Sequence, residues 1–154
     1  MHLRKGPFLA VLLAACGGSY RTATSAPSSG GVTASGYFIT ISNLTYSPLN
    51  LAVPPGATVT VMNDDGMLHS VTSESAPGAF TPGSVAGVSF DTGEFASGTS
   101  SFTVPASAAN GTIIPYYCTF HKAGMMTPNG TITVSTSAAP SPAPAPTPPP
   151  MPGM

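Results

Sequence analysis

The chain has 154 residues, of which only 6% are charged, and it carries a formal net charge of −1. Four basic residues in the whole chain exclude the basic patch that nucleic-acid binding needs. With 18 prolines gathered largely toward its ends, the chain has room for one folded domain of about a hundred residues.

The first fifteen residues have the pattern of an export signal. Arg4 and Lys5 make a basic start, and residues 8–15 form an apolar stretch too short to cross a bilayer of about 30 Å as a helix. Leu13-Ala14-Ala15-Cys16 then resembles a bacterial lipobox, in which the cysteine is lipidated. We therefore expect a signal peptide over 1–15 and a lipid anchor on Cys16, which would hold the protein on a membrane without spanning it. An ordinary secretory signal is the alternative.

Two low-complexity flanks surround the expected domain. Residues 16–35 are rich in Gly, Ser, Thr and Ala and are expected to form a flexible tether. Residues 136–154 alternate Pro with small residues, a composition that favours extended polyproline II and cannot build a core. The sequence thus predicts a folded domain over 36–135.

Eight short segments of this domain alternate apolar and polar residues or are rich in β-branched and aromatic side chains. Gly, Pro and Asn turns separate them, and no window shows a convincing helical period. This pattern predicts an all-β sandwich. The predicted strands cover residues 37–42, 49–53, 58–61, 69–73, 88–90, 100–104, 112–118 and 131–135.

Residues 116–126 concentrate side chains that bind soft metals. They contain a thiol, an imidazole and two thioethers: Cys118, His121, Met125 and Met126. Such ligands together favour copper over harder metals.

A further strong ligand is available in His69, which follows the turn segment 63–68. If the signal is removed, His69 and His121 are the only histidines left. Lipidation of Cys16 would leave Cys118 as a lone thiol in an exported protein, and metal ligation explains such a thiol better than a Cys16–Cys118 disulfide does.

The Cys-x2-His motif, together with Asn-x2-Gly-x2-His upstream, resembles the cupredoxin family, with a pattern like that of plastocyanin-like and amicyanin-like domains. The resemblance covers about residues 36–135. It implies a Greek-key β-sandwich that binds one copper ion through two His, one Cys and a weak axial Met. The implied ligands are His69, Cys118, His121 and Met126.

Two methionines are candidates for the axial position. A methionine five residues after the loop histidine, the usual spacing in the family, selects Met126, whereas the azurin-like spacing of four selects Met125. The loop is also two residues longer than is usual before the last strand. Asn63 and Ser70 resemble positions where polar groups brace the ligand loops, although a turn Asn and a strand Ser would look the same.

The resemblance implies electron transfer by a mononuclear type 1 (blue) copper site that cycles between Cu(I) and Cu(II), and no enzymatic activity. His121 would be the partly exposed exit for the electron. Redox partner proteins would dock at the apolar surface around it, to which Met67, Leu68, Phe120 and Ala123 would contribute. Tyr117 offers a second route, or is simply a packed strand tyrosine.

A copper-binding or delivery protein without a redox partner is the alternative function. Structural zinc generally needs four Cys or His ligands, and only three are available. Without the signal, the chain has two basic and five acidic residues, a net charge of −3, so docking should depend on apolar contact more than on steering. We expect a monomer, exported to the periplasm or cell surface, with no nucleic-acid partner and with a lipid anchor to a bacterial membrane.

Overall fold

The structure, a computed structural model, describes residues 34–145. The signal, Cys16, most of the tether and residues 146–154 lie outside this range. The described residues form nine strands and a short 3₁₀ helix: β1 (Ser35–Ser42), β2 (Thr45–Ser47), β3 (Asn50–Val53), β4 (Thr58–Asn63), β5 (Thr72–Ser73), β6 (Gly98–Thr103), β7 (Ile113–Tyr117), η1 (Lys122–Gly124), β8 (Asn129–Val134) and β9 (Ser141–Pro142).

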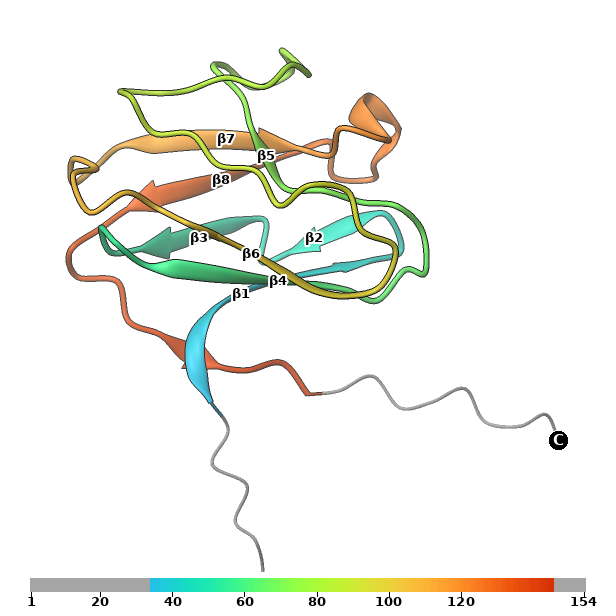
Figure 1. The fold of residues 1–154 in the computed structure, drawn as a ribbon, viewed down its shortest axis with the longest axis horizontal. Helices are drawn as coiled ribbons and strands as arrows, with labels where there is room; N and C mark the ends of the chain where they lie inside the picture. Colours follow the sequence, from blue (N-terminus) through green and yellow to red (C-terminus); the bar gives the residue numbers. More distant parts are fainter. Residues whose placement is uncertain (1–33, 146–154) are drawn as a thin grey trace, which may run out of the picture. The chain divides into compact units, whose positions relative to one another are not determined.

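These strands make two sheets that form a β-sandwich (Figure 1). One sheet has the order β2-β1-β4-β6, with β9 added beside β1, and the other has the order β3-β8-β7-β5. Both sheets are mixed, because β1 pairs with β4 and β3 pairs with β8 in parallel, whereas the other pairs are antiparallel. The prediction of an all-β sandwich is confirmed.

The core follows from the alternation of apolar residues along the strands. In β4 the burial pattern alternates strictly, so Val59 and Val61 point inward while Thr58 and Thr60 do not. Strands β7 and β8 contribute inward residues from the opposite sheet. Burying each aliphatic side chain contributes about 1.5–3 kcal/mol. Fully buried aliphatic side chains at the centre are Ile39, Ile41, Val53, Val59, Val61, Val71, Val104, Ile114, Ile132 and Val134.

One predicted strand is shorter than expected, and another is absent. The segment 69–73 forms a strand only at β5, while His69 makes an isolated bridge to Phe95. The segment 88–90 is no strand, and Val88 makes an isolated bridge to Val85 across Ala86 and Gly87. Both of those residues have positive φ, 49° and 78°, which turns the chain back on itself too sharply for a continuous ladder.

The folded part continues past the predicted boundary at Ser135. Strand β9 pairs with the beginning of β1, and the Ala143 N–H donates to the Ala34 carbonyl at 2.9 Å. The Tyr37 hydroxyl donates to the Ala138 carbonyl at 3.1 Å. The two ends of the described chain therefore meet at the end of β1 that is remote from the β1–β2 turn.

A buried carboxylate holds the long irregular segment between β5 and β6. Glu74 is 0% exposed and accepts hydrogen bonds from the N–H groups of Gly78 and Phe80, at 3.1 and 2.7 Å, and from the Asn129 side chain. These donors replace the water that the carboxylate loses on burial. Over residues 34–145, no helix is long and apolar enough to cross a membrane.

Candidate metal centre

Cys118 and His121 lie in the turn that leaves strand β7. Cys118 directly follows the strand, and its carbonyl accepts a hydrogen bond from the Lys122 N–H at 2.8 Å. The Gly124 N–H donates to the His121 carbonyl at 2.8 Å, which begins the 3₁₀ helix η1. This tight turn brings His121 Nδ1 to 3.6 Å from Cys118 Sγ.

His69 approaches the same sulfur from the other side of the site. Its backbone exchanges two hydrogen bonds with Phe95, of 3.1 and 3.0 Å, which fix the direction of the side chain. His69 Nδ1 lies 3.7 Å from Cys118 Sγ. The rings of His69 and His121 are 4.6 Å apart between centroids. His69 and Cys118 are fully buried, whereas His121 is half-buried.

These separations fit a metal ion shared by the three side chains. A metal bound to sulfur at about 2.3 Å and to nitrogen at about 2.0 Å, with about 120° between the bonds, places the two donor atoms about 3.7 Å apart. The observed distances are 3.6 and 3.7 Å. Among the described residues, the potential ligand atoms of His69, Cys118 and His121 all lie within 4.8 Å of one another. One thiolate and two imidazoles in a trigonal arrangement suit copper.

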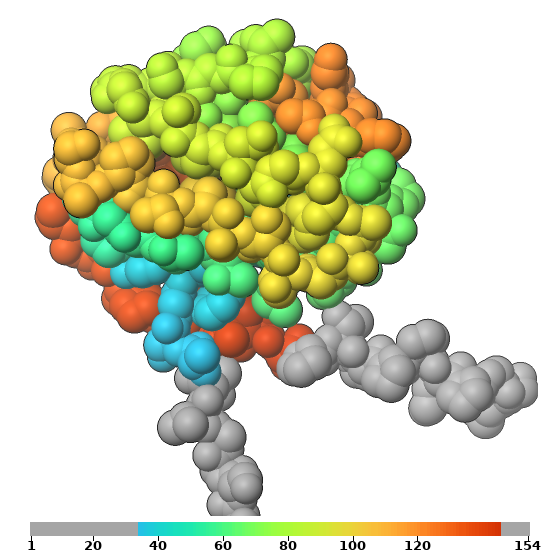
Figure 2. All heavy atoms as spheres, in the orientation of Figure 1, coloured from blue at the N-terminus to red at the C-terminus, as the bar shows by residue number. Residues whose placement is uncertain are grey.

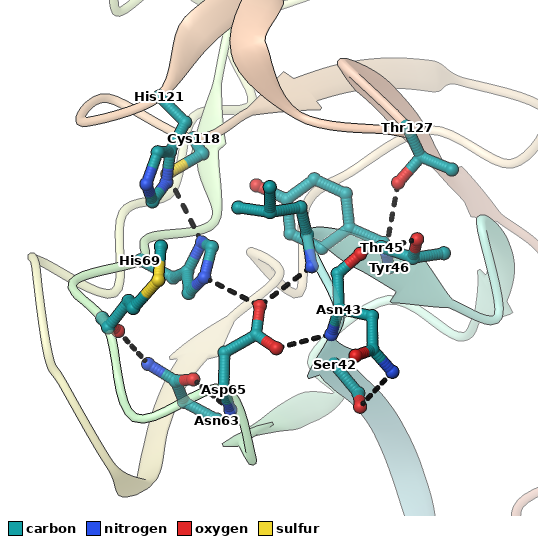
Figure 3. A network of polar contacts seen from close by, with 12 residues as sticks. Ser42, Asn43, Thr45, Tyr46, Asn63, Asp65, His69, Cys118, His121 and Thr127 are labelled. Atoms are coloured by element: carbon teal, nitrogen blue, oxygen red, sulfur yellow. Dashed lines mark hydrogen bonds and ion pairs between the residues drawn. The ribbon is translucent and has the colours of Figure 1, made fainter.

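Asp65 sets the orientation of the His69 ring. The His69 Nε2–H donates to Asp65 Oδ2 at 2.9 Å, which leaves the Nδ1 lone pair directed toward Cys118. Figure 3 shows His69 between this carboxylate and the pair formed by Cys118 and His121. Burial lowers the pKa of His69, and the charge of His121 lowers it further, against the opposing effect of Asp65. A lowered pKa keeps the imidazole neutral at pH 7, as metal ligation requires.

Sequence reasoning missed Asp65. The residue sits in a segment whose Asn, Asp and Gly are typical of a turn, and a turn explains an aspartate without any further role. The only available signal was its position four residues before His69, and that spacing has no fixed meaning outside a helix.

The predicted bracing by Asn63 and Ser70 is confirmed. The Asn63 side-chain amide donates to the carbonyls of Met67 and Phe95, at 2.8 and 2.6 Å, and so ties the loop before His69 to the segment after it. Ser70 Oγ accepts a hydrogen bond from the Thr119 N–H at 2.9 Å, directly after Cys118. Both side chains therefore connect segments that carry ligands.

The structure places the two loop methionines differently from the expectation. Met126, the expected axial ligand, is 74% exposed, while Met125 is 4% exposed and packs in the same core cluster as Cys118. The Met126 N–H donates to the Leu44 carbonyl at 2.9 Å, so the backbone there turns toward β2. A side chain that lies mostly in solvent is poorly placed to reach a buried donor cluster, so the burial of the two methionines favours Met125 over Met126.

No protein-family model matches the chain, and a search of curated proteins finds no match either. Among solved structures, a novel purple cupredoxin from Nitrosopumilus maritimus is 30% identical to this chain. The match covers 64% of this chain and 99% of that protein, with a TM-score of 0.48. The chain belongs to the cupredoxin family.

Two amicyanin structures have lower sequence identity to the present chain. An oxidized amicyanin mutant is 21% identical over 65% of this chain and 82% of that one, with a TM-score of 0.47. The Cu(I) form of another amicyanin mutant is 20% identical over 68% of this chain and 87% of that one, also with a TM-score of 0.47.

Membership of the family agrees with the donor set found in the structure. Cupredoxins are copper-binding electron-transfer proteins, and the three side chains His69, Cys118 and His121 give this cupredoxin the thiolate and imidazoles that copper needs. Copper is therefore the cofactor, as the sequence predicted.

Proposed function

We propose that this cupredoxin is an electron carrier with one type 1 copper site per chain, which cycles between Cu(I) and Cu(II). The observation that supports it best is the convergence of two imidazole nitrogens on the buried Cys118 sulfur, at 3.6 and 3.7 Å. Copper supplies a one-electron couple when it is bound there. The chain contributes the donors and the frame that holds them, and it acts as a carrier rather than an enzyme.

The segments that carry the proposed ligands are held rigidly by the fold. Cys118 follows strand β7, His69 is bridged to Phe95, and the two ligand segments are joined through Ser70 and Thr119. Ligands held by packing and hydrogen bonds keep their positions when the charge of the site changes. A site that barely moves between oxidation states transfers electrons with little reorganisation.

The fourth ligand in this proposal is the thioether of Met125. Its burial in the core cluster that contains Cys118 supports this choice. Axial thioethers are weak, long ligands that tune the reduction potential. Met126 then becomes part of the exposed surface.

We test the electron-transfer function by loading the purified protein with copper. The proposal predicts one copper per chain, an intense visible thiolate-to-Cu(II) absorption band and a reversible one-electron potential. A blue or purple colour would satisfy it equally, since one relative is a purple cupredoxin. A colourless protein that holds only Cu(I) would instead indicate copper delivery, and tight binding of zinc alone would refute both functions.

Redox partners are proposed to dock on the apolar surface beside His121. Four large side chains there are exposed: Met67 (44%), Leu68 (38%), Phe120 (56%) and Met126 (74%). The Phe120 ring contacts the His121 ring edge-on, with 4.9 Å between centroids. In Figure 2 the loop that carries Phe120, in orange, and the loop before His69, in green, lie at the same side of the molecule. Exposed apolar groups of this kind suit brief docking.

Phe120→Lys should slow electron exchange between reduced and oxidized copies of the protein, as measured by NMR line broadening. The introduced charge would have to be desolvated when two apolar surfaces meet. Ile113→Lys is the matched control, because Ile113 is 55% exposed and lies at the other end of β7 from Cys118. Equal slowing in both variants would place the docking surface elsewhere.

We further propose that the protein is exported, as cupredoxins typically are, and anchored through a lipid on Cys16. Support comes from Leu13-Ala14-Ala15-Cys16 and the polar segment after it. Mass spectrometry of protein from native membranes should find a mature N-terminus at lipid-modified Cys16, and Cys16→Ser should release the protein into the soluble fraction. An unmodified chain that begins elsewhere would contradict the anchor.

A further inference from the structure

We propose that Asp65 is a positioning residue that lowers the reduction potential of the copper site and couples both ligand loops to the β1–β2 turn. This inference rests on the proposed electron-transfer function, because it concerns how that site is tuned. It begins from one observation: a single carboxylate contacts a ligand histidine and two backbone N–H groups at once (Figure 3).

Asp65 contacts the ligand candidate His69 directly. Asp65 Oδ2 accepts the His69 Nε2–H at 2.9 Å, and the side chains of His69 and Asp65 are 0% and 10% exposed. A carboxylate on the outer nitrogen of a metal-bound imidazole makes the inner nitrogen a stronger donor. A stronger donor and a nearby negative charge both stabilise Cu(II) more than Cu(I), which lowers the reduction potential.

No lysine or arginine of the described residues pairs with the Asp65 carboxylate. In the part of the chain that the structure describes, Lys122 is the only lysine or arginine, and it forms no ion pair with Asp65. Salt screens a partly buried pair of this kind less than it screens exposed charges. The negative charge of Asp65 therefore acts mainly on the His69 imidazole and on a copper ion that this imidazole would bind.

Asp65 also stabilises the turn between β1 and β2. Asn43 and Leu44 form a two-residue connection, since Ser42 pairs with Thr45, and their φ angles are 52° and 58°. Left-handed backbone at both positions favours Asn or Gly, so Leu44 is unfavourable there. Asp65 accepts the N–H groups of both turn residues, that of Leu44 at 2.8 Å, and so stabilises the conformation.

The same turn holds the second ligand loop. The Leu44 carbonyl accepts hydrogen bonds from the N–H groups of Met126 and Thr127, at 2.9 and 3.4 Å. Thr127 Oγ1 in turn accepts the Tyr46 N–H at 2.9 Å. A continuous path of hydrogen bonds thus runs from His69 through Asp65 and Leu44 to the backbone beside Met125. One side chain fixes a ligand in the first loop and the path of the second loop.

The test is the reduction potential of copper-loaded Asp65→Asn, measured by voltammetry. The amide has nearly the same shape and keeps one acceptor oxygen, but it has no charge. We expect copper to remain bound with its visible band, while the Cu(II)/Cu(I) equilibrium shifts about tenfold toward Cu(I), which for one electron is a rise of about 59 mV. Asp64→Asn is the matched control, since it removes the same charge from the exposed neighbouring residue, and its shift should be much smaller. Equal shifts in the two variants, or none in Asp65→Asn, would overturn the tuning role.

A second measurement does not need copper. In the metal-free protein, ¹⁵N chemical shifts should show His69 as the Nε2–H tautomer, and Asp65→Ala should lose this preference while Leu44→Gly keeps it. Leu44→Gly relieves the strained turn without touching the carboxylate, so it separates a turn-bracing role from a role at the imidazole. If wild-type protein failed to bind copper, the electron-transfer proposal would fall, and the tautomer result would still decide whether Asp65 positions His69. An unchanged tautomer in Asp65→Ala would refute the positioning role.

Discussion

Replacing Cys118 with serine is expected to abolish the visible absorption band of the copper-loaded protein and to weaken copper binding by orders of magnitude. The band depends on a thiolate bonded to Cu(II), and a serine hydroxyl is neither ionised at neutral pH nor a soft ligand. Cys118 is 0% exposed, lies in the donor cluster and is the only cysteine among residues 34–145, so no other thiol in that part of the chain can replace its sulfur. Absorption spectra and metal analysis of the purified variant measure the effect.

The matched control is the other cysteine. Cys16→Ser makes the same substitution at the other cysteine without changing the donor cluster, so its copper content and spectrum should equal those of the wild type. Survival of the band in Cys118→Ser would show that the cluster of His69, Cys118 and His121 is not the copper site. The electron-transfer proposal would then have to be abandoned.

Replacing Met125 with glutamine is expected to keep copper bound and to lower the reduction potential by more than about 59 mV, a tenfold change in the one-electron equilibrium. The amide oxygen is a harder ligand than the thioether and favours Cu(II). Because Met125 is only 4% exposed, placing an amide there should also destabilise the fold by about 1–3 kcal/mol. Voltammetry and denaturant unfolding report the two effects separately.

Met126→Gln provides the internal comparison, since it makes the same change one residue later. Met126 is 74% exposed, and a substitution there should alter stability by less than about 0.5 kcal/mol and barely move the potential. A large shift for Met126 and a small one for Met125 would return the axial role to Met126. The remaining three ligands would be unaffected by that result.

The cluster of His69, Cys118 and His121 could be predicted from the sequence because the relevant residue types are so scarce. The described part of the chain has one cysteine and two histidines, and all three lie in the same cluster. Scarcity left almost no alternative assignment. The sandwich was also predictable, since alternation in segments such as β4 and β8 depends only on which face of a strand meets the core.

The axial ligand could not be predicted in this way. Met125 and Met126 are adjacent in a loop that has no period, so a one-residue step decides which side chain faces inward. That step depends on the positive φ of Lys122 and on the hydrogen bond from Met126 to Leu44, which is distant in sequence. Family spacing favours Met126, whereas the burial of the two side chains favours Met125.

What the sequence determined by itself was therefore the chemistry of the site and the class of the fold. Both follow from residue type and local period, which a single chain displays directly. Only the tertiary structure showed which methionine is buried, that Asp65 contacts His69, and that β9 pairs with β1. Each of these depends on a contact between segments whose separation in sequence carries no regular signal, as when Asp65 meets the Leu44 N–H 21 residues away.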